Sequence, residues 1–218
     1  MIDYAKARFN MVESQLRTNR VADRRVIGAF ETVPRERFVP EHLKSIAYVD
    51  EDLKIGESRY LMEPMVLARL LEAAEIGSAD VALDIGCGFG YATAVMARLA
   101  ATVVALESDP GLAEQAEAAL QAEGVDNAVV VTGPLEQGYR KQAPYNVILV
   151  NGAVAEVPTA ITDQLAEGGR LVTVVKQGQT MGRATLLERV GDVVSSRTLY
   201  DAATPWLEGF TREPGFVF

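Results

Sequence analysis

The chain has 218 residues, of which 49% are hydrophobic, with a formal net charge of −9 and one cysteine. This length suggests one domain, with or without an appendage, and no apolar run reaches the roughly 18 residues of a membrane span. The acidic balance disfavours nucleic acid as a partner, and the single Cys87 together with the lack of a signal-peptide core predicts a cytoplasmic protein.

Residues 1–75 are predicted to form a mainly helical extension that packs on the rest of the chain. A helical period marks residues 2–18 and again residues 22–33, and Pro34 ends the second helix because proline cannot continue it. The apolar faces of these helices are predicted to consist of Ala5, Phe9, Val12 and Leu16 in the first, and of Val26, Phe30 and Val33 in the second.

The remainder of this extension is predicted to be less regular. Residues 34–40 begin and end with proline, which predicts an extended segment. Residues 46–62 lack a strong period, which indicates a loop with one or two short strands, and such a loop can form a substrate wall. Pro64 then opens a buried helix, since proline is favoured at the first helical position.

A glycine-rich turn at residues 86–90 follows an apolar strand at 81–85 and precedes a helical pattern. Alternate positions of the turn are glycine, which lacks a Cβ and tolerates positive φ, so the backbone can approach a ligand closely. Asp84 lies two residues before the first glycine, as in the (D/E)-x-G-x-G-x-G pattern of S-adenosylmethionine-binding methyltransferases. The alternative, a dinucleotide motif, has no such acid and would place Tyr91 where a small residue packs.

Residues 76–218 are predicted to form the core, a Rossmann-like α/β methyltransferase fold. The predicted strands after the turn are 102–106, 128–132, 146–150 and 169–175, with helical segments between them that include 159–165. Such alternation is typical of a parallel sheet covered on both faces. Gly191 and Asp192 link two further strand-like runs as a tight hairpin. We therefore expect a mostly parallel seven-stranded sheet with an antiparallel C-terminal hairpin, and an aromatic tail, residues 206–218, packed back on the body.

The ligand is expected at the carboxyl ends of the strands, as in other open α/β sheets. Glu107 ends the second strand of the core, where its carboxylate can accept hydrogen bonds from two ribose hydroxyls. Cys87 is interpreted as a small turn residue beside the cofactor, because no histidine pairs with it nearby. The residues predicted to bind S-adenosylmethionine are Asp84, Gly86, Cys87, Gly88, Phe89, Gly90, Tyr91, Glu107, Ser108, Leu135 and Asn151. We assign no residue to a metal site.

Several blocks of the sequence are similar to those of a known family. The most specific is VPRERFVP at residues 33–40, and the others are 11–16, 47–50, 83–91, 143–148 and 164–172. In these blocks the chain resembles the protein-L-isoaspartate (D-aspartate) O-methyltransferases over nearly its full length. The resemblance implies an O-methyltransferase that uses S-adenosylmethionine, releases S-adenosylhomocysteine and methylates a carboxylate of damaged aspartyl residues in proteins.

The chain departs from the family pattern on the predicted substrate side. After Ile-Gly the family has roughly H/Q-G-Q-T-I-S-Q-P, whose hydroxyl groups help to hold the substrate carboxylate, whereas residues 57–64 read ESRYLMEP. Tyr60 replaces the threonine and Met62 the serine. Pro134 stands where the family has an aspartate near the cofactor.

The catalytic candidates are Arg59, Tyr60 and Met62. A carboxylate acceptor is ionised near neutral pH, so methyl transfer to it requires positioning and no general base. Met62 cannot donate a hydrogen bond and is interpreted as an apolar wall residue. Arg59 or Tyr60 can replace the lost donors, and the alternative interpretation of Arg59 is a solvent-exposed loop charge. Glu63 would repel a carboxylate if it faced the site.

Two classes of function stay open at this point. The first is an active methyltransferase that acts on isoaspartyl proteins or peptides, or on another acceptor such as a small molecule. The second is a non-catalytic interaction protein that binds the cofactor, or no ligand, and acts through its N-terminal and aromatic C-terminal segments. The sequence leaves the acceptor and the oligomeric state undetermined.

Overall fold

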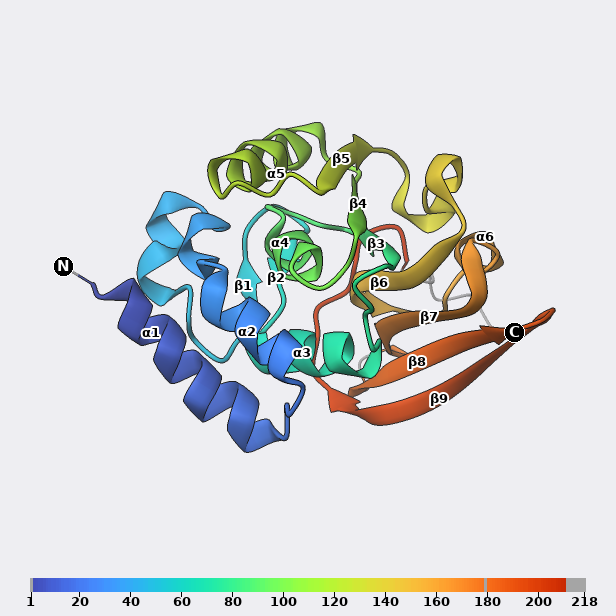
Figure 1. Cartoon of the computed structure of the whole chain (residues 1–218), viewed down its shortest axis with the longest axis horizontal. Coiled ribbons are helices and arrows are strands. Elements are labelled where there is room, and N and C mark those ends of the chain that lie inside the picture. The colour runs from blue at the N-terminus through green and yellow to red at the C-terminus, as the bar shows by residue number, and fades with distance from the viewer. Residues whose placement is uncertain (1, 179, 211–218) are drawn as a thin grey trace.

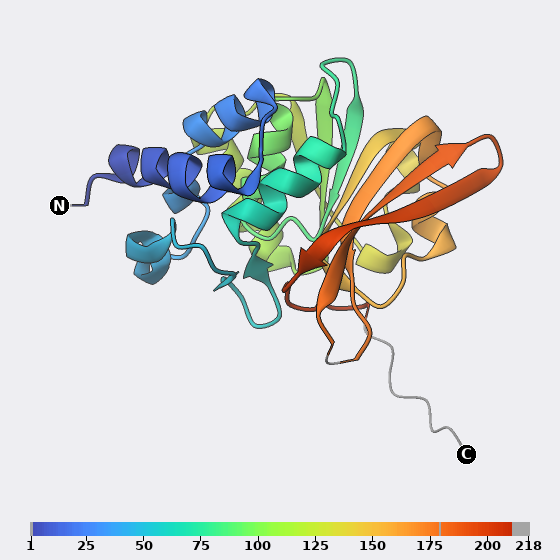
Figure 2. The same cartoon turned by 90° about the horizontal axis from the view of Figure 1, so that it is seen from below.

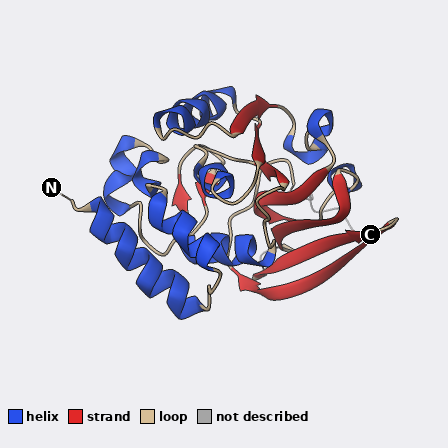
Figure 3. Ribbon diagram, viewed as in Figure 1, coloured by secondary structure: helices blue, strands red, loops and turns tan. Residues whose placement is uncertain are grey.

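The computed structural model describes residues 2–178 and 180–210 as helices packed around a seven-stranded sheet (Figures 1 and 3). The helices are α1 (Tyr4–Met11), α2 (Arg24–Thr32), α3 (Pro64–Ala73), α4 (Tyr91–Ala97), α5 (Pro110–Ala122) and α6 (Thr159–Thr162). The strands are β1 (Leu53–Lys54), β2 (Tyr60–Leu61), β3 (Val81–Ile85), β4 (Thr102–Glu107), β5 (Ala128–Thr132), β6 (Tyr145–Val154), β7 (Leu165–Val175), β8 (Gly182–Val190) and β9 (Val193–Ala202).

The sheet has the strand order β5-β4-β3-β6-β7-β8-β9. Strands β3 to β7 run parallel to one another, β8 pairs antiparallel with β7, and β8 and β9 form an antiparallel hairpin. The predicted fold class is therefore confirmed. The reversal of the strand order at β3 places the carboxyl ends of β3, β4 and β6 side by side, where a ligand binds in folds of this type.

Successive residues of β3 alternate between two hydrophobic clusters, one on each face of the sheet. Ala82 belongs to a cluster that includes buried side chains of α2, α3 and α4. Leu83 and Ile85 belong to the other cluster, which contains Ile161 of α6 and Leu207 of the C-terminal segment. Both faces of the sheet are therefore covered, and this explains why the strand reads as a continuous apolar run.

The N-terminal helices lie on the same side of the sheet as α3 and α4, as Figure 2 shows. The second predicted helix is confirmed as α2, and its predicted apolar residues Val26, Phe30 and Val33 are buried. They join the same cluster as the β3 residue Ala82. The extension thus packs on the core, while a domain division at residue 75 stays a prediction.

The predicted apolar face of the first helix is confirmed for Val12 and Leu16 and wrong for Ala5 and Phe9. The α-helix ends at Met11, and Val12–Leu16 forms a π-helical turn. Ala5 is exposed and Phe9 is 60% exposed, whereas Met11 and the residues at both ends of the π turn are buried. A π turn contains more residues than an α turn. Residues spaced by the α-helical period of 3.6 therefore do not stay on the same face on both sides of the π turn.

Two further segments differ from their predictions. Arg35–Arg37 forms a 3₁₀ turn instead of an extended segment, because the Arg37 N–H donates to the Pro34 carbonyl oxygen at 2.9 Å. The predicted helix at 159–165 ends at Thr162, since Leu165 already pairs with Tyr145 in the sheet. The two short strands predicted within residues 46–62 are confirmed as β1 and β2.

The C-terminal segment returns to the body of the protein after β9. Trp206 forms a parallel bridge to Ala153 of β6, and Leu207 and Phe210 are buried. The prediction that the tail packs back is confirmed for residues 206–210, and residues 211–218 lie outside the described residues. None of the helices in the described ranges combines the length and apolarity needed to cross a bilayer.

Phe30→Ala should lower the free energy of unfolding by about 3–5 kcal/mol, because Phe30 is fully buried with its ring 6.0 Å from that of Tyr91. Phe9→Ala is the control, with an expected change within about 0.5 kcal/mol. Urea unfolding followed by the fluorescence of Trp206, the only tryptophan, measures both. An unchanged Trp206 transition in the Phe30 variant would mean that the extension unfolds separately from the core.

Candidate functional site

The turn between β3 and α4 requires glycine for two reasons. Its φ angles are positive, and neighbouring side chains leave no room for a Cβ. Gly86, Gly88 and Gly90 have φ angles of 82°, 56° and 88°. A Cβ on Gly86 would lie 2.8 Å from Leu207 Cδ1, and one on Gly88 would lie 2.8 Å from Ile55 Cδ1. The predicted positive φ is confirmed. The turn is packed against the loop before the core (residues 46–62) and against the C-terminal segment that follows β9 (residues 203–210).

Asp84 is fully buried just before this turn and links α4 to β6. It accepts a hydrogen bond from Thr93 Oγ1 at 2.7 Å and one from Asn151 Nδ2 at 3.3 Å. Burial raises the pKa of the Asp84 carboxyl to about 7, although the two hydrogen bonds act in the opposite direction. The predicted cofactor residues Asp84 and Asn151 are therefore in contact with each other at the carboxyl edge of the sheet.

Glu107 at the end of β4 forms a buried ion pair with Arg59. Arg59 Nη2 lies 2.8 Å from Glu107 Oε1, and Arg59 Nε donates to both carboxylate oxygens at 3.1 and 3.0 Å. The exposed fractions of the two side chains are 3% and 0%. The interpretation of Arg59 as a solvent-exposed loop charge is therefore wrong.

The Glu107 carboxylate also receives three backbone N–H groups. Oε2 accepts from Gly88 at 2.9 Å, and Oε1 accepts from Ser108 at 2.7 Å and Asp109 at 3.1 Å. A carboxylate offers about four lone-pair sites, so these donors and Arg59 together occupy it. Two ribose hydroxyls can bind to Glu107 only after Arg59 moves away.

The residues around β2 alternate between two environments. Arg59 and Leu61 are buried on the side that holds Glu107 and the hydrophobic core. Ser58, Tyr60 and Met62 line a small cavity, in keeping with the two-residue period of a strand, and Met62 also joins the hydrophobic core to which Leu61 belongs. The structure thus separates the three catalytic candidates, with Arg59 beside the predicted cofactor residue Glu107 and Tyr60 and Met62 beside the cavity.

This cavity measures about 10 Å³ and lies between the loop before the core and the C-terminal segment. The interpretation of Met62 as an apolar wall residue is confirmed, because it is buried and lines the cavity. The remaining lining residues are Asp52, Asn151, Gly152, Thr204, Pro205, Trp206 and Leu207. Asn151 brings the cavity next to Asp84, so the cavity adjoins the predicted cofactor residues.

The C-terminal segment packs against the glycine turn and the loop before it through Leu207 and Glu208. A Cβ on Gly152 would lie 2.8 Å from Leu207 Cβ, so Leu207 packs between the first glycine of the turn and β6. Ser58 Oγ donates to Glu208 Oε2 at 2.5 Å, and Arg59 Nη1 lies 3.7 Å from the same oxygen. The loop before the core and the C-terminal segment are thus joined directly above the glycine turn.

Carboxyl groups gather beside the cavity with raised pKa values. Asp52 Oδ1 accepts the Glu63 N–H at 2.9 Å. Burial raises the pKa of Asp52 to about 6, and burial followed by the charges of Asp52 and Asp50 raises the pKa of Glu63 to about 7. Glu63 is not among the residues that line the cavity, so the repulsion expected if it faced the site stays a prediction.

The side chains of three other predicted cofactor residues, Tyr91, Leu135 and Cys87, lie in environments that differ from one another. The Tyr91 ring contacts Phe38 in the N-terminal extension, with ring centroids 5.9 Å apart, so it points away from Asp84. Leu135 packs in the cluster on the Leu207 face of the sheet. Burial raises the pKa of Cys87 well above its ordinary value, which agrees with a turn residue that is no nucleophile. Their roles in cofactor binding stay predictions.

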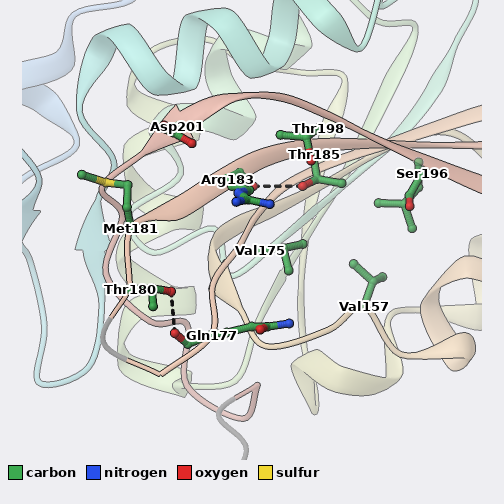
Figure 4. Close-up of a pocket in the computed structure, with 11 residues that line it drawn as sticks. Val157, Val175, Gln177, Thr180, Met181, Arg183, Thr185, Ser196, Thr198 and Asp201 are labelled. Carbon is green, nitrogen blue, oxygen red and sulfur yellow. Dashed lines mark hydrogen bonds between the residues drawn. The ribbon is translucent and has the colours of Figure 1, made fainter.

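A larger open cavity of about 660 Å³ lies over the antiparallel end of the sheet (Figure 4). It is lined by side chains of β7, β8 and β9, which include Arg183, Thr185, Thr198 and Asp201. Thr185 Oγ1 donates to the Arg183 carbonyl oxygen at 2.9 Å, so this hydroxyl is already satisfied. The cavity contains none of the predicted site residues. Within residues 2–178 and 180–210, no group of three or more His, Cys, Asp or Glu side chains is placed to hold a metal ion.

The comparison with known proteins identifies the family. The family model described as "Protein-L-isoaspartate(D-aspartate) O-methyltransferase (PCMT)" matches residues 7–201. The chain belongs to the protein-L-isoaspartate O-methyltransferase family. The resemblance inferred from the sequence blocks is therefore confirmed.

Relatives of this family match over most of their length. A protein-L-isoaspartate O-methyltransferase from Methanoculleus marisnigri is 41% identical over 188 residues, which cover 86% of this chain and 86% of the relative. One from Roseiflexus sp. is 39% identical and covers 92% of this chain and 91% of the relative.

Solved structures of the family have the same fold. A structure described as a protein-L-isoaspartate O-methyltransferase matches with a TM-score of 0.81 and 26% identity, over 93% of this chain and 66% of that chain. A Plasmodium falciparum structure described as "a putative protein-L-isoaspartate O-methyltransferase beta-aspartate methyltransferase (PCMT)", in complex with S-adenosyl-L-homocysteine, matches with a TM-score of 0.78 and 18% identity, over 95% of this chain and 99% of that chain.

Sequence reasoning missed three features of the site in this family member. Thr204 lines the cavity but precedes the predicted tail of residues 206–218 and was not singled out, and Leu207 was predicted only to pack on the body with that tail. Asp52 was not singled out, because one acid in a charged loop gives no signal of burial. The pairing of Arg59 with Glu107 was missed because the two residues lie 48 positions apart.

The stability of the protein should depend on pH through Asp84. A carboxyl group whose pKa is raised by folding stabilises the fold fully below its unfolded pKa of about 4. This stability is lost as the pH rises through the folded value of about 7. Asp84→Asn removes this titration, so the variant should lose less unfolding free energy than the wild type between about pH 4 and 7.

Urea unfolding at a series of pH values measures the effect of Asp84→Asn. Asp52 and Glu63 titrate in the same range, so the difference between variant and wild type is the quantity to compare. Asp192→Asn in the exposed hairpin turn serves as the control. Parallel curves for wild type and Asp84→Asn would contradict the raised pKa.

Proposed function

We infer that this protein is an S-adenosylmethionine-dependent O-methyltransferase that methylates the carboxylate of isoaspartyl residues in proteins or peptides. The family match over residues 7–201 carries this inference. The glycine turn with Asp84 before it and the acid Glu107 at the next strand end supports the cofactor assignment. Relatives at about 40% identity bear the name of this activity.

The residues at the carboxyl edge of the sheet have the chemical properties that binding of S-adenosylmethionine requires. The glycines let other groups approach the turn where a Cβ would clash, as Leu207 and Ile55 do, and Asn151 Oδ1 is a buried acceptor without a partner among the described residues. We propose that Asp84, the turn 86–90 and Glu107 hold the cofactor, together with Ser108, Leu135 and Asn151. The cavity of about 10 Å³ is far smaller than this ligand, so binding requires Arg59 and Leu207 to shift.

The bound cofactor supplies an activated methyl group on a sulfonium, and the protein supplies position. The acceptor carboxylate is ionised near neutral pH and attacks without a general base. The chain must therefore hold this carboxylate in line with the methyl group and exclude water, and such positioning accounts for several kcal/mol of the barrier. The buried surroundings of Met62 and Leu207 provide a dry site for this purpose.

The acceptor pocket is proposed to lie at the cavity lined by Tyr60 and Met62. Its lining of tyrosine, methionine and Trp206 also suits an aromatic or apolar small-molecule acceptor, which is the second candidate. We propose a cytoplasmic location and a protein or peptide substrate, as predicted from the sequence.

Transfer of a labelled methyl group from S-adenosylmethionine to an isoaspartyl peptide tests this function. We expect label on the isoaspartyl peptide and none on the matched aspartyl peptide. Circular dichroism of the same preparation shows that the protein is folded. Folded protein that binds S-adenosylhomocysteine yet labels neither peptide would contradict the isoaspartyl activity and favour another acceptor. Absence of cofactor binding would contradict the whole proposal.

Arg59→Gln should bind S-adenosylmethionine about tenfold more tightly, the equivalent of roughly 1.4 kcal/mol, because it frees the Glu107 carboxylate. Without cofactor the same variant should be less stable than the wild type, since a buried carboxylate loses its charged partner. Isothermal titration calorimetry and urea unfolding measure the two effects.

Arg37→Gln is the control for this substitution, because Arg37 is exposed and lies 3.8 Å from Glu123, away from the turn. It should change neither the affinity nor the stability appreciably. Equal or weaker cofactor binding by Arg59→Gln would show that Arg59 stays beside Glu107 when the cofactor binds.

A further inference from the structure

A buried hydroxyl of the C-terminal segment lacks a hydrogen-bond partner. Thr204 is 4% exposed, and its Oγ1 has no partner among the described residues. It lines the small cavity together with Tyr60 and Met62. A buried polar group without a partner costs free energy of folding. Such a group beside a proposed acceptor site therefore indicates that a ligand supplies the missing hydrogen-bond partner.

The backbone around Thr204 is fixed to the sheet. The Ala153 N–H donates to the Pro205 carbonyl oxygen at 2.8 Å, and the Leu207 N–H donates to the Ala153 carbonyl oxygen at 2.8 Å. These bonds hold the segment beside β6 like a short additional strand. Thr204 therefore presents its hydroxyl from a defined position, which a positioning residue requires.

The other groups around the cavity are less suited to donate to a carboxylate. Met62 has no donor, and Ser58 Oγ already donates to Glu208. Asn151 directs its amide nitrogen to Asp84 at 3.3 Å, and its atom without a partner in the described structure is the acceptor Oδ1. The Tyr60 side chain is partly exposed, so water competes for its hydroxyl.

We propose that Thr204 donates a hydrogen bond to the acceptor carboxylate and replaces the hydroxyl groups that the family carries where this chain has Tyr60 and Met62. The donor is supplied by a segment that lies more than 140 positions later in the chain than those two residues. This inference rests on the proposed methylation of isoaspartyl residues and identifies a positioning residue for it. The acceptor is thus a carboxylate that receives a neutral hydroxyl donor in a buried pocket.

The test compares Thr204→Val, which keeps the shape and removes the donor, with Thr204→Ser, which keeps the donor. We expect Thr204→Val to lower kcat/KM for the isoaspartyl peptide by about 10- to 100-fold, the usual range for one hydrogen bond to a charged group. Thr204→Ser should retain activity within about threefold of the wild type. Affinity for S-adenosylhomocysteine, measured by calorimetry, should be the same in all three proteins.

Thr185→Val is the matched control, because Thr185 is also a buried threonine but lines the large cavity over β8. It should leave kcat/KM unchanged. A Thr204→Val variant as active as the wild type would overturn this inference while the proposed function stands, and would leave a bound water as the partner of the hydroxyl. Equal losses in Thr204→Val and Thr204→Ser would overturn it in favour of a packing role. Wild-type protein that neither binds nor methylates the isoaspartyl peptide would overturn both proposals.

Discussion

The buried ion pair between Arg59 and Glu107 is the interaction on which the cofactor side of this protein depends. Two charges are tolerated without water only where good geometry and further hydrogen bonds compensate for their lost hydration. Here backbone N–H groups of Gly88 and Ser108 complete the shell of the carboxylate. One carboxylate therefore connects the loop before the core, the glycine turn and the entry to α5. The position of that loop and access to the cofactor residues are consequently linked.

Strand alternation around β2 divides the site into two halves. Arg59 serves the half that contains Glu107, while Tyr60 and Met62 face the cavity on the other side. The second wall of that cavity is the C-terminal segment with Thr204 and Leu207. A change of side chain in one wall can thus be compensated from the other, although the two walls are far apart in the sequence. This arrangement would allow the proposed acceptor site to stay polar although the family's hydroxyl groups are replaced at two positions.

The N-terminal extension holds two parts of the site in place through the buried side chain of Arg35. Arg35 of the VPRERFVP block is fully buried, and its guanidinium lies 4.8 Å from the centre of the Tyr91 ring. It also donates to the carbonyl oxygens of Ala47 at 2.7 Å and Met62 at 2.8 Å. This one side chain therefore fixes both the start of α4 and the backbone of the cavity wall. The block that made the family recognisable is, in the structure, a support for the residues around the cavity.

The sequence by itself determined the sheet, the glycine turn and the family, because these follow from local signals: apolar runs, alternate glycines and Asp84 at a fixed spacing. It did not determine the partners of the polar groups. The pairing of Arg59 with Glu107 and the return of Thr204 to the cavity join residues that are remote in the chain, and no local period records such contacts. The π turn after Met11 was equally hidden, since packing rather than sequence periodicity decides where a helix changes its pitch. Tertiary structure alone decided which charges are buried together, because burial depends on what the rest of the fold places around them.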